Sequence, residues 1–68
     1  MQYIELREIV KKRRKVLHIS QERLAELSEV SLRTIIEFES GQGNPTLKTL
    51  ENLAEVLGLE LKLEIKKL

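Results

Sequence analysis

Apolar residues recur every three or four positions over most of the chain, a spacing that predicts α-helices. The expected helices span about residues 4–17, 21–28, 32–39 and 47–57. Ser20, Ser31 and Thr46 stand just before the last three, where a side-chain hydroxyl can accept a hydrogen bond from a free amide of the first turn. Gly58 follows the fourth run and is typical of a helix C-terminus. The pattern therefore predicts an all-α fold of four helices.

The same spacing predicts which side chains form the core. Each expected helix carries one apolar stripe, and these stripes must pack against one another to leave water. The residues in the stripes are Leu6, Ile9, Val10, Leu17, Leu24, Ala25, Leu27, Ile35, Phe38, Leu50, Leu53, Ala54 and Leu57.

The C-terminal segment 59–68 has a different pattern. Apolar and charged residues alternate without a break from Leu59 to Lys66, which predicts a half-buried β-strand. A single strand cannot satisfy its own backbone, and the pattern indicates no other strand in the chain. We therefore expect residues 1–58 to form the helical domain and residues 59–68 to pair with a second copy. The alternative is a disordered tail. The expected homodimer interface is Leu59, Leu61, Leu63 and Ile65.

Charge indicates the register of this pairing. An antiparallel pair centred on Leu63 places Glu60 opposite Lys66 and Lys62 opposite Glu64, whereas centring on Lys62 places like charges opposite one another. We therefore expect the Leu63-centred register.

The second and third helices are separated by only a few residues, Ser28 to Ser31. Helices joined so tightly must cross steeply and present the start of the second helix outward, which is the helix-turn-helix arrangement. His18 stands where the first helix ends, at a position expected to need a left-handed or irregular backbone.

Residues 6–58 resemble the Xre family, the lambda-repressor-like helix-turn-helix domains of Cro and cI type. The resemblance rests on fixed spacings in Ser20-Gln21-Glu22-Arg23-Leu24-Ala25, Val30-Ser31, Thr34-Ile35 and Glu39-Ser40-Gly41-Gln42-Gly43-Asn44-Pro45. Glu29 departs from the family pattern, which usually has glycine at this point because the backbone there has a positive φ. The resemblance therefore implies a left-handed backbone at Glu29, and a glutamate in that conformation costs about 1 kcal/mol relative to glycine.

The resemblance implies binding to double-stranded DNA and assigns roles to single residues. In the family, residues matching Leu32, Arg33 and Glu37 reach base edges in the major groove. Phosphates are contacted at the positions of Gln21, Ser31 and Thr34, and in the following loop at Gly41, Gln42 and Asn44. The resemblance also implies a partly buried structural ion pair between Arg14 and Glu39.

The expected outward face of the third helix allows two interpretations. Arg33 can grip guanine O6 and N7 with two hydrogen bonds, and Leu32 and Ile36 can contact a thymine methyl group. Glu37 can accept from cytosine, but it repels phosphates and is equally well explained as a solvated carboxylate. An exposed isoleucine beside Leu32 is also typical of a protein contact. The alternative is therefore a protein-interaction module of the same fold with weak or lost DNA binding.

Composition limits the remaining possibilities. The 68 residues suffice for one small domain, and they include no cysteine, no aspartate and one histidine. We therefore expect no catalytic site, no metal site and no cofactor. No signal peptide or long apolar run is present, so a cytoplasmic location is expected. The net charge of +1 is low for a nucleic-acid binder, but residues 11–15 form one cationic run. That run is either a solvated helix face or a contact to the phosphate backbone.

Within the Xre family, a minimal domain that ends in a short dimerising strand resembles the HipB-like antitoxins. Such proteins repress their own operon as dimers on a palindromic operator and bind a cognate toxin. A stand-alone repressor without a toxin is equally compatible with these residues.

Overall fold

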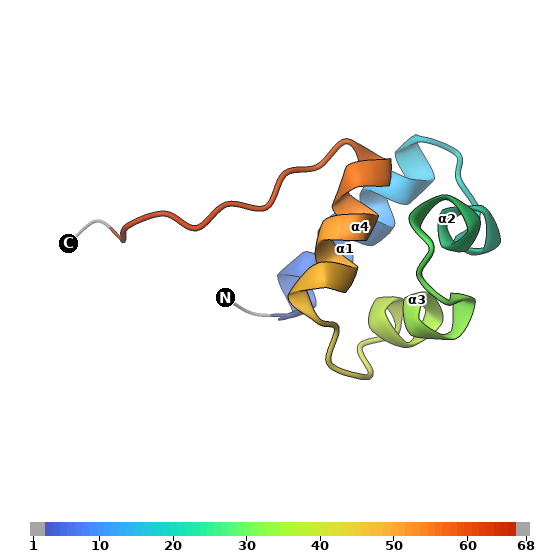
Figure 1. Cartoon of the computed structure of the whole chain (residues 1–68), viewed down its shortest axis with the longest axis horizontal. Helices are drawn as coiled ribbons and strands as arrows, with labels where there is room; N and C mark the ends of the chain where they lie inside the picture. The colour runs from blue at the N-terminus through green and yellow to red at the C-terminus, as the bar shows by residue number, and fades with distance from the viewer. Residues whose placement is uncertain (1–2, 67–68) are drawn as a thin grey trace.

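Four α-helices account for most of the computed structural model, which describes residues 3–66 (Figure 1). They are α1 (Tyr3–Val16), α2 (Gln21–Ser28), α3 (Leu32–Glu39) and α4 (Leu47–Leu57). The all-α prediction is confirmed, and α2, α3 and α4 have the expected boundaries. Helix α1 begins and ends one residue earlier than expected. No helix within residues 3–66 has both the length and the apolar character needed to cross a membrane.

Side-chain caps explain why α2, α3 and α4 begin where they do. The hydroxyl oxygens of Ser20, Ser31 and Thr46 each accept a hydrogen bond from the backbone amide three residues later, at 3.0–3.1 Å. Each cap satisfies one of the amides that a helix start leaves without a partner. At the other end of α4, Gly58 has φ +69° and closes the helix.

The core lies where all four helices meet. Its largest fully buried side chains are Leu24, Ile35, Leu53 and Leu57, which come from α2, α3 and α4. Leu6, Ala25 and Leu50 are partly buried and pack against this cluster. The remaining buried apolar residues are Val10, Val30, Phe38 and Ala54.

Three residues that were expected in the core are exposed, so the prediction is wrong for them. Ile9 is 51% exposed, because α1 packs through a narrow stripe that contains its neighbour Val10. Leu17 lies beyond the end of α1 and is 38% exposed. Leu27 is exposed at the rim of a shallow groove between α2 and α4, beside Val56. The spacing of apolar residues correctly predicts which side of each helix faces the core. It does not predict how wide a strip of that side the neighbouring helices cover.

Two non-glycine residues have a left-handed backbone, as expected: His18 with φ 56° and Glu29 with φ 60°. At the second position the buried Ser28 hydroxyl donates to the Leu24 carbonyl at 2.6 Å and accepts from the Val30 amide at 3.3 Å. These bonds satisfy polar groups inside the tight turn between α2 and α3. The turn therefore adopts a left-handed backbone at Glu29 despite the glutamate.

A buried ion pair joins α1 to α3. Arg14 donates from Nε and Nη2 to the two carboxylate oxygens of Glu39, each at 2.8 Å. Its Nη1 donates to the Ile19 carbonyl at 3.0 Å, and Gln21 Nε2 donates to Glu39 Oε1 at 3.1 Å. Burial alone raises the pKa of Glu39, but the hydrogen bonds from Arg14 and Gln21 and the charges of Arg14 and Lys11 outweigh it and lower that pKa. The hydrogen bonds that Arg14 donates to Glu39 raise the pKa of Arg14.

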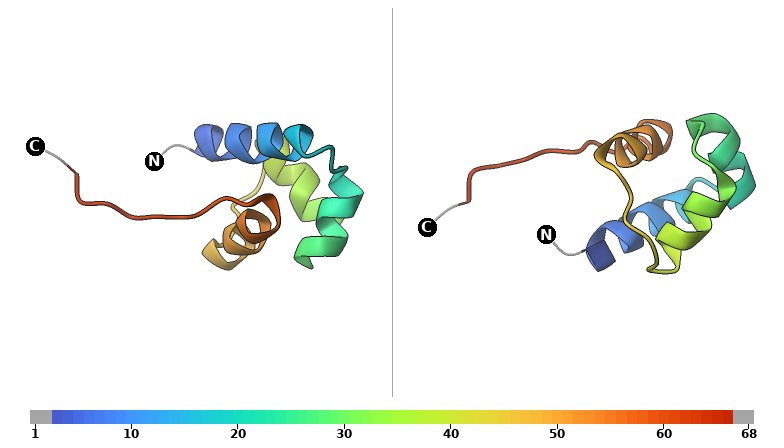
Figure 2. Two further views of the ribbon diagram at one scale, coloured as in Figure 1. Left: turned by 90° about the horizontal axis from the view of Figure 1, so that it is seen from above. Right: turned by 60° about the horizontal axis from the view of Figure 1, so that its bottom comes forward.

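The expected C-terminal strand is not formed. Residues 60–66 leave the end of α4 as an extended segment and project beyond the start of α1 (Figures 1 and 2), with no strand pairing in the described part of the chain. The physical reason is that no second strand lies within reach to take its backbone hydrogen bonds. Leu59 is anchored, because its amide donates to the Ala54 carbonyl at 2.9 Å and its side chain packs on the core. Residues 67–68 of the expected strand lie outside the described residues.

The Arg14–Glu39 pair predicts an acid-dependent loss of stability. A carboxyl with a lowered pKa in the folded state binds its proton more readily in the unfolded state, so its contribution is complete above the ordinary value of 4.5 and is lost as the pH falls below it. Urea unfolding from neutral pH to about pH 3 should show this loss, and Glu39→Gln should be less stable at neutral pH and less sensitive to acid. Glu55→Gln, at an exposed position on α4, is the matched control. An unchanged acid dependence in Glu39→Gln would contradict the assignment.

Glu29→Gly should stabilise the fold by about 0.5–1 kcal/mol, because glycine adopts a positive φ without strain. Thermal and urea unfolding measure the change. Glu26→Gly makes the same substitution inside α2, where glycine costs about 1 kcal/mol, so the two variants should shift stability in opposite directions. A loss of stability in both variants would show that the turn at Glu29 is not strained.

Candidate nucleic-acid interface

Helix α3 presents one face to the core and the other to solvent. Ile35 and Phe38 are buried, as the spacing predicts, and Glu39 is buried where it meets Arg14. Leu32, Arg33 and Ile36 are exposed, and Glu37 lies beside them, half-buried. The structure therefore brings together the three residues expected to reach base edges, Leu32, Arg33 and Glu37.

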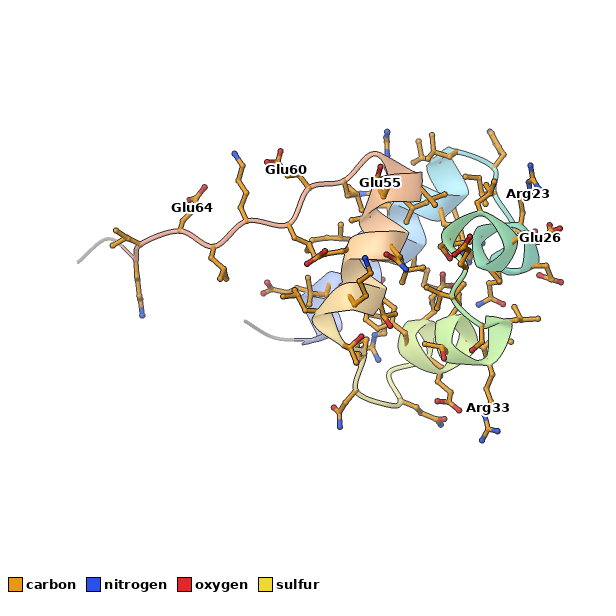
Figure 3. The ribbon with its side chains drawn as sticks, viewed as in Figure 1. Arg23, Glu26, Arg33, Glu55, Glu60 and Glu64 are labelled. Carbon is orange, nitrogen blue, oxygen red and sulfur yellow. The ribbon has the colours of Figure 1, made fainter. Side chains whose placement is uncertain are left out.

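Arg33 and Glu37 form an ion pair that was not predicted. Arg33 Nε donates to Glu37 Oε1 at 2.9 Å, one helical turn apart. Figure 3 shows Arg33 projecting away from the body of the protein, well separated from Arg23 and Glu26 on α2. The signal was present in the sequence, because oppositely charged residues four positions apart on a helix are neighbours.

The polar residues at the start of α2 and α3 already have partners within the fold. The Ser31 and Thr34 hydroxyls lie 2.8 Å apart, and the Ser31 oxygen also accepts from the Thr34 amide. The Gln21 amide group donates to Glu39. Since a side-chain amide has two N–H donors, Gln21 keeps one that can donate outward.

The loop after α3 uses its first backbone amides to close the helix. The Gly41 amide donates to the Phe38 carbonyl at 3.1 Å, and the Gln42 amide donates to the Glu37 carbonyl at 2.7 Å. These two amides are therefore engaged within the fold, while the side chains of Gln42 and Asn44 are exposed and can meet a ligand. Both line a small cleft of about 140 Å³, whose other walls are Thr34, Glu37, Phe38, Gly43 and Pro45.

Arg7 was not singled out from the sequence, yet its side chain reaches this loop. The guanidinium of Arg7 occupies the space in which a Cβ of residue 41 would lie, so Gly41, with φ +90°, is required for the contact. Arg7 Nε is buried without a hydrogen-bond partner in the described part of the chain. The contact brings a cation from α1 beside the loop. The sequence spacing could have indicated this contact, because Arg7 lies two turns before Arg14 and therefore on the same face of α1, the face that meets α3.

The cationic run 11–15 does not act as one patch. Arg13 Nε donates to the Leu57 carbonyl at 2.8 Å and so holds α1 against the end of α4, while Arg14 binds Glu39. Lys12 and Lys15 are exposed on α1 beside Glu8. The solvated-face interpretation fits these two lysines, and the two arginines are structural.

Comparisons with known proteins agree with this arrangement. The helix-turn-helix family profile matches residues 10–63. A protein of Methanothermobacter thermautotrophicus, described as an uncharacterised HTH-type transcriptional regulator, is 38% identical over 55 residues, which cover 81% of this chain and 80% of that protein. The matched region contains α2, the turn, α3 and α4. The chain belongs to the Xre (Cro/cI-type) helix-turn-helix family of transcriptional regulators.

Proposed function

We propose that this protein is a sequence-specific DNA-binding repressor that reads the major groove with α3. The observation that carries the proposal is the outward face of α3, where Arg33 projects into solvent with its Nη1 and Nη2 groups unengaged by any hydrogen bond in the described residues. An arginine presented in this way can donate two hydrogen bonds to guanine, and Leu32 and Ile36 beside it can contact thymine methyl groups.

Phosphate contacts hold the helix in place in this proposal. Gln21 is the first residue of α2, Ser31 and Thr34 stand at the start of α3, and Gln42 and Asn44 follow α3 on the exposed loop beside Gly41. Arg7 adds a cation behind that loop. Such contacts set the orientation of the protein on the duplex, whereas base contacts set the sequence preference.

A homodimer formed through the C-terminal segment completes the proposed repressor. Leu63 and Ile65 are 98% and 97% exposed in the single chain, an unfavourable arrangement for two large apolar side chains. Beside them, Leu6, Leu47, Leu50 and Leu61 line an apolar groove of about 390 Å³. Pairing residues 60–66 of two copies covers these side chains and satisfies the backbone groups along the facing edge of each segment.

The Leu63-centred register suits this groove. In that register Ile65 of one copy lies opposite Leu61 of the other, and Leu61 borders the groove. Glu60 and Glu64 project from one side of the extended segment (Figure 3), so the charged residues pair with their opposites away from the apolar side.

The biological role in this proposal rests on the resemblance to HipB-like antitoxins. A two-fold symmetric dimer binds a palindromic operator, and the operator is taken to lie upstream of the protein's own gene. The protein then represses its own operon as the antitoxin partner of a toxin. A stand-alone repressor uses the same surfaces, and the two roles differ only in whether a toxin binds.

One observation favours a second function, a protein-interaction module of the same fold. Glu37 neutralises the charge of Arg33, and Leu32 and Ile36 leave an apolar patch on the outward face of α3. Such a surface also suits a protein partner. DNA affinity and its dependence on salt separate the two functions.

Arg33→Ala should abolish most of the preference for the protein's own upstream DNA over a shuffled duplex, because one bidentate arginine–guanine contact supplies about 1–3 kcal/mol of discrimination. Fluorescence anisotropy at low and moderate salt measures both affinities. Arg23→Ala is the matched control, since Arg23 is also an exposed arginine in an ion pair, with Glu26 at 3.6 Å. It removes the same charge and should leave the preference intact.

Two results would contradict the proposal. Equal and weak binding of the unaltered protein to both duplexes, with little dependence on salt, supports the interaction module instead. An equal effect of the two arginine substitutions would show that net charge, and not base contact, determines the affinity.

Single cysteines test the dimer and its register, since the chain contains none of its own. Leu63→Cys should form a disulfide-linked dimer on oxidation. In the Leu63-centred register the two copies of residue 63 lie directly opposite one another, with their Cβ atoms about 4.5–5.5 Å apart. Lys62→Cys should link poorly, because the two copies of residue 62 are diagonal neighbours in this register and lie about 7–8 Å apart. Preferential linking through residue 62 would contradict the register, and a monomer in sedimentation of the unaltered protein would contradict the dimer.

A further inference from the structure

The Arg33–Glu37 ion pair has no evident role in holding the fold together. Both residues belong to α3, so the pair joins no two elements. The Arg33 side chain is 88% exposed and the Glu37 side chain 39%. Exposed pairs of this kind contribute little to stability. The role of this pair is therefore more readily explained by ligand binding than by fold stability.

Glu37 lies against the loop that follows α3. Its side chain forms one wall of the cleft beside that loop, and Oε2 lies 3.4 Å from the position that a Cβ of residue 43 would occupy. The backbone carbonyl of Glu37 accepts from the Gln42 amide at 2.7 Å and from the Ser40 hydroxyl at 3.0 Å, so the loop fixes the backbone from which the carboxylate projects. Because Gly43 has no side chain, the loop leaves room for the carboxylate on this side.

The atoms used in the pair determine how Arg33 can meet a base. A guanidinium has one N–H at Nε and two at each Nη. Glu37 takes the Nε donor, so the side-on edge formed by Nε and its neighbouring Nη is not available to a ligand. The end formed by Nη1 and Nη2 remains, and it matches the O6 and N7 acceptors of guanine.

We propose that Glu37 is a positioning residue, which fixes the Arg33 guanidinium for end-on contact with guanine and thereby sets the sequence preference of α3. The inference rests on the DNA binding proposed above. Glu37 has a second effect, because its negative charge opposes phosphate and lowers affinity for DNA of any sequence. The first effect increases the ratio of specific to non-specific binding, whereas the second lowers both affinities alike and leaves that ratio unchanged.

The test begins with selection of duplexes from a random pool by the unaltered protein, followed by anisotropy titrations. The guanine that Arg33 contacts is identified as the one at the base pair where Arg33→Ala no longer prefers guanine over the other bases. Each variant is then titrated against the selected duplex and against one with that pair replaced. The variants are Glu37→Ala, which removes the acceptor, and Glu37→Gln, whose amide oxygen can still accept from Nε. Glu26→Ala is the matched control, because it removes the same charge from the exposed Arg23–Glu26 pair.

Glu37→Ala should reduce the preference for guanine by about three- to tenfold, which is a typical coupling within one polar network. Glu37→Gln should retain the preference to within about twofold, and Glu26→Ala should not change it. In the Arg33→Ala background, Glu37→Ala should have no further effect on the preference. Circular dichroism melting checks that every variant is folded.

Three results would overturn the inference. The first is an unchanged guanine preference in Glu37→Ala, which leaves the proposed DNA binding intact. The second is an equal loss in Glu37→Ala and Glu37→Gln, which would assign the effect to charge and not to the hydrogen bond. The third is the absence of any sequence selected from the pool, which removes the proposed function together with this inference.

Discussion

The Arg14–Glu39 ion pair is the interaction on which the rest of the structure depends. It brings α1 and the last residue of α3 together, and the same two side chains also bind the Ile19 carbonyl and the Gln21 amide group, so α1, the segment before α2, α2 itself and α3 meet at one place. A buried carboxylate without a partner is very unfavourable, which restricts the helices to arrangements that keep the pair intact. The orientation of α3, and therefore of its outward face, follows from this restriction.

The outward face of α3 is shaped by the loop that follows it. Gly41 accommodates the Arg7 guanidinium, and Gly43 leaves room for the Glu37 carboxylate. The amides of residues 41 and 42 close the helix, so this short loop both ends α3 and borders the Glu37 side chain on its surface. The surface that the family resemblance assigned to DNA is in this way coupled to α1 and the loop.

The tail presents the opposite physical situation. Helices satisfy their backbone groups internally, but an extended segment must find hydrogen-bond partners outside itself. Residues 60–66 carry regular apolar side chains and have no neighbouring strand in the described part of the chain, so their backbone lacks strand partners and Leu63 and Ile65 are left exposed. The tail and the helix-turn-helix lie toward opposite ends of the long axis (Figure 1), and a contact through the tail therefore leaves α3 uncovered.

The sequence by itself determined the helices, their caps and the helix-turn-helix. Those features arise from residues within a few positions of one another, such as Ser31 with Thr34, and local spacing is visible in a sequence. Only the tertiary structure decided that Ile9 faces solvent, that Arg13 binds the Leu57 carbonyl and that Arg7 lies against Gly41. These outcomes depend on the distance and angle between helices, which periodicity does not specify. The predicted strand is the clearest case, because its hydrogen-bond partners are not local, and the described part of a single chain does not supply them.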